Sequence, residues 1–146
     1  MQILLLLLLQ TVLPLGATAP TAAGDTVPVT IVLTNLPSTT STISINFYNS
    51  AETFLKSGQE VLHKKVVPRN QSQVQMQVDL PPGEWAVALS QDMNDNGKMD
   101  YNLLGIPTEP YAFSNNVRPR FKAPDFEECK FMAKGEGHTL TIRLEK

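Results

Sequence analysis

The chain is poor in the residues that cross-link a protein or give it a strong charge of one sign. Cys129 is the single cysteine among 146 residues, so no internal disulfide forms, and stability must come from packing or from a ligand. The formal net charge is −2, whereas binding of nucleic acid requires a strongly basic face, so we expect no nucleic-acid partner. Cys129 has no histidine near it in the sequence, which favours a buried structural thiol over a nucleophile.

One long hydrophobic run is present, and it stands at the start of the chain. It extends from Ile3 to Leu9 and is soon interrupted by Gln10, Thr11 and Pro14, whereas a membrane-spanning helix needs about 20 apolar residues. Small residues follow it, as signal peptidase requires. We therefore predict a signal peptide over residues 1–23 and an exported, periplasmic or extracellular protein without a stable membrane anchor after cleavage. Residues 24–146 then form a single domain.

Most of that domain alternates apolar and polar residues with a period of two, which is typical of half-buried strands. The Trp85 strand carries small residues, Ala86 and Ala88, opposite its large ones, which predicts a central strand closely approached on its second face. The strand at 60–68 contains lysines that suit an edge. The predicted fold is all-β, an antiparallel β-sandwich of about six or seven strands. The predicted strands lie within residues 26–36, 42–50, 60–68, 73–80, 83–92 and 139–145.

Short non-strand elements connect these segments. Residues 49–58 predict a single helical turn, with Ser50 as N-cap and Gly58 just past its end. A second short helix is predicted over residues 125–131, after Pro124. The sequence Leu-Pro-Pro-Gly at 80–83 predicts the turn into the Trp85 strand, because the prolines fix the backbone and Gly83 allows positive φ.

Residues 92–100 have the form D-x-N-x-N-G-x-x-D, which is typical of loops that wrap a calcium ion. Oxygen side chains at alternate positions converge on the ion, the glycine permits the sharp turn, and the seventh residue supplies its main-chain carbonyl. Position 12 is Leu103 and not the glutamate of a helix-loop-helix site, so a later carboxylate must complete the site, with Asn102 as a neutral alternative. We predict a Ca²⁺ affinity of roughly 10⁻⁴ to 10⁻³ M. The predicted ligands are Asp92, Asn94, Asn96, Lys98 through its carbonyl, Asp100 and Glu109.

An ion-free turn is the alternative interpretation of this loop. Asn96-Gly97 is a preferred pair for a tight hairpin in which both residues have positive φ, and Asp and Asn side chains form local turns without a metal. A simple hairpin does not, however, need oxygen side chains at all of positions 92, 94, 96 and 100.

The stretch "DMNDNGKMDYNLLGIPTEPYAFSNN", preceded by "LPPGEWAVAL" and followed by "APDFEECKF", resembles the bacterial family known as domain of unknown function 2141. The resemblance implies a small exported domain with a transthyretin-like (prealbumin-like) or carboxypeptidase-regulatory-like β-sandwich, and it brings no catalytic residues. Many members of the family carry histidine at the position of Gln91. If that histidine binds a metal, the site of this chain is altered.

Three kinds of function agree with these patterns. The first is a non-enzymatic exported module whose Ca²⁺ loop presents side chains to a protein or glycan partner, although the aromatic residues could instead pack the loop onto the sandwich, as we expect for Phe113. The second is a metal-assisted hydrolase that uses the carboxylates of residues 92–109; His63 and His138 are distant in sequence, and we favour a non-enzyme. The third is an envelope assembly protein, against which the edge lysines argue. The predicted partner-binding residues are Tyr101, Tyr111, Asn115 and Asn116.

Overall fold

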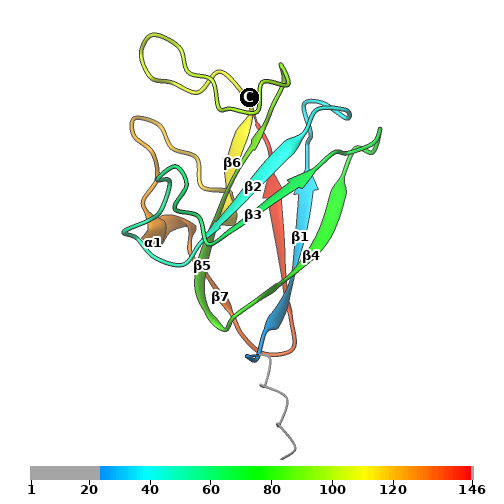
Figure 1. Ribbon diagram of the computed structural model, residues 1–146, viewed down its shortest axis with the longest axis vertical. Coiled ribbons are helices and arrows are strands. Elements are labelled where there is room, and N and C mark those ends of the chain that lie inside the picture. The colour runs from blue at the N-terminus through cyan, green and yellow to red at the C-terminus, as the bar shows by residue number, and fades with distance from the viewer. Residues whose placement is uncertain (1–23, 146) are drawn as a thin grey trace, which may run out of the picture.

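The computed structural model describes residues 24–145, so the predicted signal peptide lies outside the described residues. Two facing sheets build the domain (Figure 1). The three-stranded sheet has the order β4-β1-β8, and the five-stranded sheet has the order β3-β2-β5-β6, with β7 also paired to β5. The strands are β1 (Val27–Thr34), β2 (Ile43–Tyr48), β3 (Leu62–Val66), β4 (Val74–Leu80), β5 (Gly83–Gln91), β6 (Tyr111–Phe113), β7 (Phe131–Ala133) and β8 (His138–Arg143).

The predicted all-β sandwich is confirmed, with two differences in detail. The described residues form eight strands and not six or seven, because β6 and β7 have three residues each, too few to show an alternating pattern. The sheets are also not wholly antiparallel, because β1 pairs with β8 in parallel from Val29↔His138 to Thr34↔Arg143. The connection after β7 crosses from the five-stranded sheet to the other sheet and brings β8 in along β1.

The inner faces of the two sheets form the main core. Alternate residues of β1 are fully buried there, among them Val29, Ile31 and Leu33. Trp85 and Val87 of β5 pack into the same cluster from the opposite sheet. Each such apolar side chain contributes about 1.5–3 kcal/mol when it leaves water, so this cluster is the principal source of the fold's stability.

A second, smaller core covers part of the outer face of the five-stranded sheet. Ala86 and Ala88 of β5 are buried there in one cluster with Phe54 and Phe126, whose rings meet edge to face with centroids 5.8 Å apart. The prediction that β5 is covered on one face and closely approached on the other is therefore confirmed.

The helical predictions are partly right. Helix α1 (Phe126–Cys129) lies within the predicted range, and the Glu128 carboxylate accepts a hydrogen bond from the Asp125 N–H at 2.8 Å. The predicted helical turn at 49–58 is wrong. That segment forms hydrogen-bonded turns in which Leu55 has a φ of 61°, and a residue in this region ends a right-handed helix. No helix among residues 24–145 is long and apolar enough to cross a membrane.

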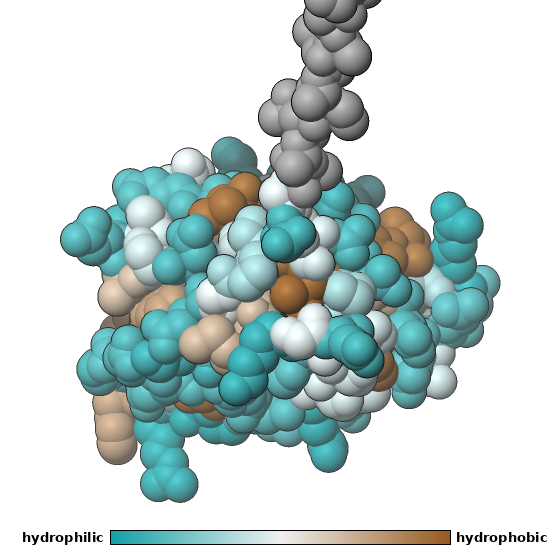
Figure 2. All heavy atoms as spheres, turned by 90° about the horizontal axis from the view of Figure 1, so that it is seen from below, coloured by the Kyte–Doolittle hydropathy of each residue, from teal (hydrophilic) through white to brown (hydrophobic). Residues whose placement is uncertain are grey.

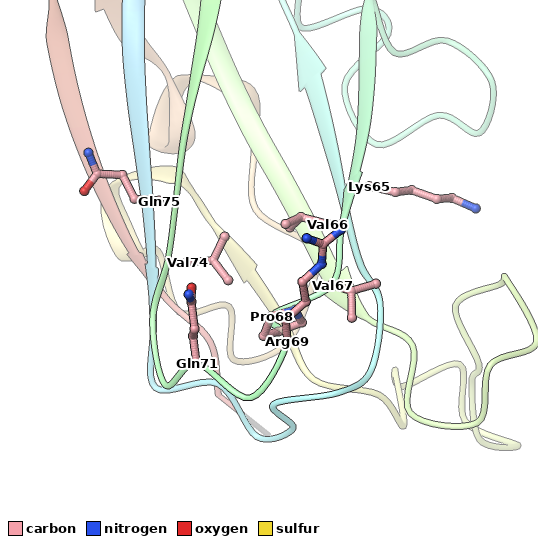
Figure 3. Close-up of a pocket in the computed structure, with 8 residues that line it drawn as sticks. All are labelled: Lys65, Val66, Val67, Pro68, Arg69, Gln71, Val74 and Gln75. Carbon is pink, nitrogen blue, oxygen red and sulfur yellow. The ribbon is translucent and has the colours of Figure 1, made fainter.

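The two sheets separate at the side where β3 and β4 are the edge strands (Figure 1). The connection between these strands leaves a hollow of about 640 Å³. Figure 3 shows Val66 and Val74 between the two strands and Lys65 pointing away from them. The end of the sandwich shown in Figure 2 is mostly hydrophilic, with small separate hydrophobic areas. The loop at 92–107 and the C-terminal end of the described chain lie at the opposite end (Figure 1).

Candidate metal-binding loop and the adjoining groove

The loop between β5 and β6 is held by main-chain hydrogen bonds at its base and midway along its length. At its base, the N–H of Asp92 donates to the Thr42 carbonyl and that of Gln91 donates to the Pro110 carbonyl, each at 2.9 Å. Further along, Thr108 N–H donates to the Asp100 carbonyl at 2.9 Å. These contacts divide the segment into a first loop at 92–100 and a second at 101–107, with a shared stem.

The Asp92 carboxylate organises the first loop. Its two oxygens accept hydrogen bonds from the N–H groups of Asn96 at 3.2 Å and Gly97 at 2.7 Å. Desolvation alone would raise the pKa of Asp92, but the surrounding main-chain N–H donors outweigh it and lower the pKa. The carboxylate is therefore charged at neutral pH. Since a carboxylate oxygen has two lone pairs, both oxygens can still bind a cation.

The backbone of the loop does not follow the tight hairpin that Asn96-Gly97 suggested. Positive φ occurs at Asp95 (62°) and Gly97 (75°), and Asn96 is not among the residues with positive φ. The chain wraps instead, so that its N–H groups point inward to Asp92. A wrapped chain with alternate side chains inward is the geometry that the calcium-loop prediction requires.

Asn94, Asn96 and Asp100 meet at one point of this loop. The amide nitrogens of Asn94 and Asn96 donate to Asp100 Oδ2 at 2.6 and 2.8 Å. Their amide oxygens accept from the N–H groups of Asn96 and Lys98. A half turn of each amide about χ2 exchanges nitrogen for oxygen at the same point, and this torsion has broad, roughly two-fold wells. Cation binding would therefore replace four local hydrogen bonds, two of which are made to the charged Asp100 carboxylate.

Glu109 brings a second buried carboxylate to the loop. Its side chain is buried, and Oε1 accepts a hydrogen bond from the N–H of Met93 at 2.8 Å. Oε2 is also buried but has no hydrogen-bond partner. A buried carboxylate oxygen without a donor is costly, and a cation in the adjacent loop would supply the missing interaction.

The remaining predicted ligands differ in their placement. Lys98 is exposed and stays a predicted carbonyl ligand. Asn102 lies outside the first loop, because its Oδ1 accepts from the N–H groups of Leu104 and Ile106. Within residues 24–145, no three His, Cys, Asp or Glu side chains form a group that could hold a metal. A site here must combine carboxylates with amide and main-chain oxygens, which are the ligands that Ca²⁺ takes.

A groove of about 820 Å³ adjoins the loop on the outer face of the five-stranded sheet. Tyr101 and Tyr111 both line it, as does Phe113. Phe113 is buried against Tyr111 and Phe54, which confirms that it packs the segment onto the sandwich, whereas Tyr101 is 60% exposed. The structure thus brings the two predicted tyrosines together at one surface.

The two predicted asparagines lie elsewhere and contact the main chain. Asn115 Nδ2 donates to the carbonyls of Glu128 and Lys130. Asn116 bonds with the carbonyl of Thr141 and the N–H of Arg143, which covers the free edge of β8. Partner binding by these residues stays a prediction.

Neither histidine is engaged with the loop carboxylates. His63 Nδ1 lies 2.6 Å from Asn46 Oδ1, and His138 stacks on Phe131 with ring centroids 5.4 Å apart. Sequence reasoning noted Gln91 only as the position of the family's histidine and did not foresee its structural role. Its fully buried amide bonds to the main chain of Ser38 and Ser41, so the side chain at this position faces the 38–41 turn. The signal was a glutamine at the end of a central strand whose residues 85–89 are all apolar.

A comparison with protein families matches residues 31–141 to a family described as "Uncharacterized protein conserved in bacteria (DUF2141)". The chain belongs to this family. The matched span of the DUF2141 domain includes the first loop, Glu109 and the whole groove. Comparisons with curated proteins and with solved structures give no match. The transthyretin-like resemblance stays an expectation, and the β-sandwich itself is what the structure establishes.

Proposed function

We propose that this DUF2141 domain is an exported, non-enzymatic binding module in which residues 92–109 bind Ca²⁺. The observation that carries the proposal is the buried Oε2 of Glu109, which lacks a donor beside a wrapped D-x-N-x-N-G loop. With the side-chain oxygens of Asp92, Asn94, Asn96 and Asp100 and the Lys98 carbonyl, Glu109 reaches the coordination number of roughly 6–8 that Ca²⁺ takes.

Calcium would act on the loop by joining its two ends. Asp92 leaves β5, whereas Glu109 stands just before β6, so an ion between them ties the start of the segment to its end. The second loop at 101–107, which carries Tyr101, is enclosed between these ligands. Its surface would be held in one arrangement for a partner, and pre-organised surfaces lose less entropy on binding. A protein or glycan partner is the class expected from the sequence.

The experiment is thermal unfolding of the purified protein in excess EGTA and then across millimolar Ca²⁺. A ligand of the folded state stabilises it by about 1.4 kcal/mol at ten times Kd, which raises the Tm of a domain of this size by roughly 3–6 °C. Glu109→Gln keeps the shape of the side chain and should abolish the rise. Asp95→Asn removes a charge from the same loop at a position without a predicted ligand role, and it should retain the rise.

Two results would contradict the proposal. One is a Tm that does not change up to tens of millimolar Ca²⁺. The other is an equal rise in wild type and in Glu109→Gln, which would place the ion elsewhere on the domain.

A further inference from the structure

The groove beside the metal loop has the form of a small-molecule site. Its volume of about 820 Å³ is within the roughly 300–1,000 Å³ typical of ligand pockets. The floor includes Ala88 and Ser90 of β5, whose small side chains leave space above the sheet. The walls are formed by some of the residues in three segments, 55–57, 99–107 and 119–123. These segments lie on the same side of the sheet in Figure 1.

The walls expose large apolar side chains to water. Leu104 is 83% exposed, Ile106 is 52% exposed and Phe121 is 101% exposed, and each lines the groove together with Tyr101. Large exposed apolar side chains that gather around one groove are typical of a binding site. By contrast, the hollow between β3 and β4 in Figure 3 is lined without any aromatic residue.

The charged side chains that line the groove indicate whether it binds an anion or a cation. Arg120 and Lys122 line it, and its lining includes no Asp or Glu, although the whole chain has a net charge of −2. Lys122 is paired with Asp125 at 2.9 Å. In the part of the chain that the structure describes, Arg120 has no carboxylate within ion-pair distance. Its guanidinium is therefore available to a ligand at the mouth of an apolar groove.

We propose that the groove binds a small amphiphilic anion. The ring or aliphatic chain of the ligand lies between Tyr101, Leu104 and Tyr111, and its carboxylate, sulfate or sulfonate pairs with Arg120. The planar fork of a guanidinium matches such oxyanions with two parallel hydrogen bonds. This assignment rests on the proposed function in one respect, because Ca²⁺ in the first loop would fix the 99–107 wall.

The test uses two fluorescent probes that share one aromatic skeleton. 8-Anilino-1-naphthalenesulfonate carries the anion, and N-phenyl-1-naphthylamine lacks it. Titration of the purified protein, once with Ca²⁺ and once with EGTA, should give about tenfold tighter binding of the sulfonate, the gain expected of a charge-assisted hydrogen-bonded pair. The difference should shrink in high salt.

Substitutions of exposed residues in the wall of the groove test whether the probes bind there, and they should not destabilise the fold. Arg120→Gln should remove the preference for the sulfonate and leave binding of the neutral probe unchanged. Phe121→Ser should weaken both probes. Arg69→Gln is the matched control, because Arg69 lines the other hollow (Figure 3), and it should change neither.

The outcomes separate this inference from the calcium proposal. Sulfonate binding that depends on Arg120 but not on Ca²⁺ supports the groove even if no Tm shift occurs. A calcium-dependent Tm with equal affinity for the two probes, or with a preference insensitive to Arg120→Gln, overturns the groove assignment alone. Binding to anionic lipid vesicles without binding of the soluble sulfonate also overturns it, in favour of a membrane surface.

Discussion

At the scale of single residues, the burial of the Cys129 thiol determines its chemistry. The side chain is fully buried in the smaller core. Burial, with the nearby charges of Glu128 and Asp125, raises the pKa of the thiol from 9.0 to about 12. Because the thiolate is the nucleophile, the folded protein keeps this cysteine inert at neutral pH. The sequence prediction of a buried structural thiol is confirmed.

The raised pKa predicts a loss of stability at high pH. The unfolded chain ionises near pH 9.0 and the folded protein only near pH 12, so the contribution of the thiol to stability is fully present below pH 9 and is lost as the pH rises toward 12. Urea unfolding at a series of alkaline pH values measures this loss. Cys129→Ala should lose less stability than wild type above pH 9. An equal loss of stability with pH in wild type and in Cys129→Ala would refute this role of the thiol.

At the scale of elements, one edge of β5 is completed by a side chain. β7 pairs with residues 83–85 of this strand and β6 pairs with residues 88–90. Between them, the buried Ser114 Oγ accepts a hydrogen bond from the N–H of Val87 at 2.8 Å and lies 2.5 Å from the carbonyl of Cys129. The Ser114 hydroxyl thus forms the hydrogen bond at the part of the β5 edge that neither β6 nor β7 reaches.

Removal of this hydroxyl should destabilise the whole domain. Ser114→Ala leaves the buried N–H of Val87 without an acceptor, which costs about 1–3 kcal/mol. Ser72→Ala, at an exposed position, should change the free energy of unfolding by less than about 0.5 kcal/mol. Equilibrium unfolding in urea compares the two, and equal values would show that the Ser114 contacts contribute nothing.

The longer strands could be predicted from the sequence because apolar and polar residues alternate along them, and this alternation matches which side chains are buried. The alternation does not show which strands pair with each other, so the parallel pairing of β1 with β8 could not be foreseen. Three-residue strands carry too little pattern, and the turn at 49–58 depends on a positive φ at Leu55 that no propensity rule assigns to leucine. In the site, the oxygen pattern of 92–100 and the later carboxylate Glu109 were both readable. Arg120 was not singled out as a site residue, because the groove is assembled from segments distant in sequence.

At the scale of the whole molecule, the residue that follows β8 helps to close the sandwich. Leu144 is fully buried, its N–H donates to the Thr34 carbonyl at 3.1 Å, and its carbonyl accepts from Asn35 Nδ2 at 2.7 Å. The exposed Leu103, by contrast, is 105% accessible.

Truncation of these two leucine side chains should therefore change the free energy of unfolding by very different amounts. Leu144→Ala removes core volume and should lower the free energy of unfolding by about 2–5 kcal/mol. Leu103→Ala should leave it within about 0.5 kcal/mol of wild type. Chemical denaturation distinguishes them, and a small loss for Leu144→Ala would mean that the closing segment is not part of the cooperative unit.

The pairing of β1 with β8 also determines when folding can finish. Asn35 and Leu144, which bond to each other, are 109 residues apart, and a fold dominated by such distant contacts reaches its native state slowly, in roughly milliseconds to seconds. On the ribosome, β1 emerges early but waits for its second neighbour until β8 has been synthesised. The nascent chain therefore cannot complete its three-stranded sheet before β8 has been synthesised. Such a delay would suit the proposed export if the chain crosses the membrane before it folds.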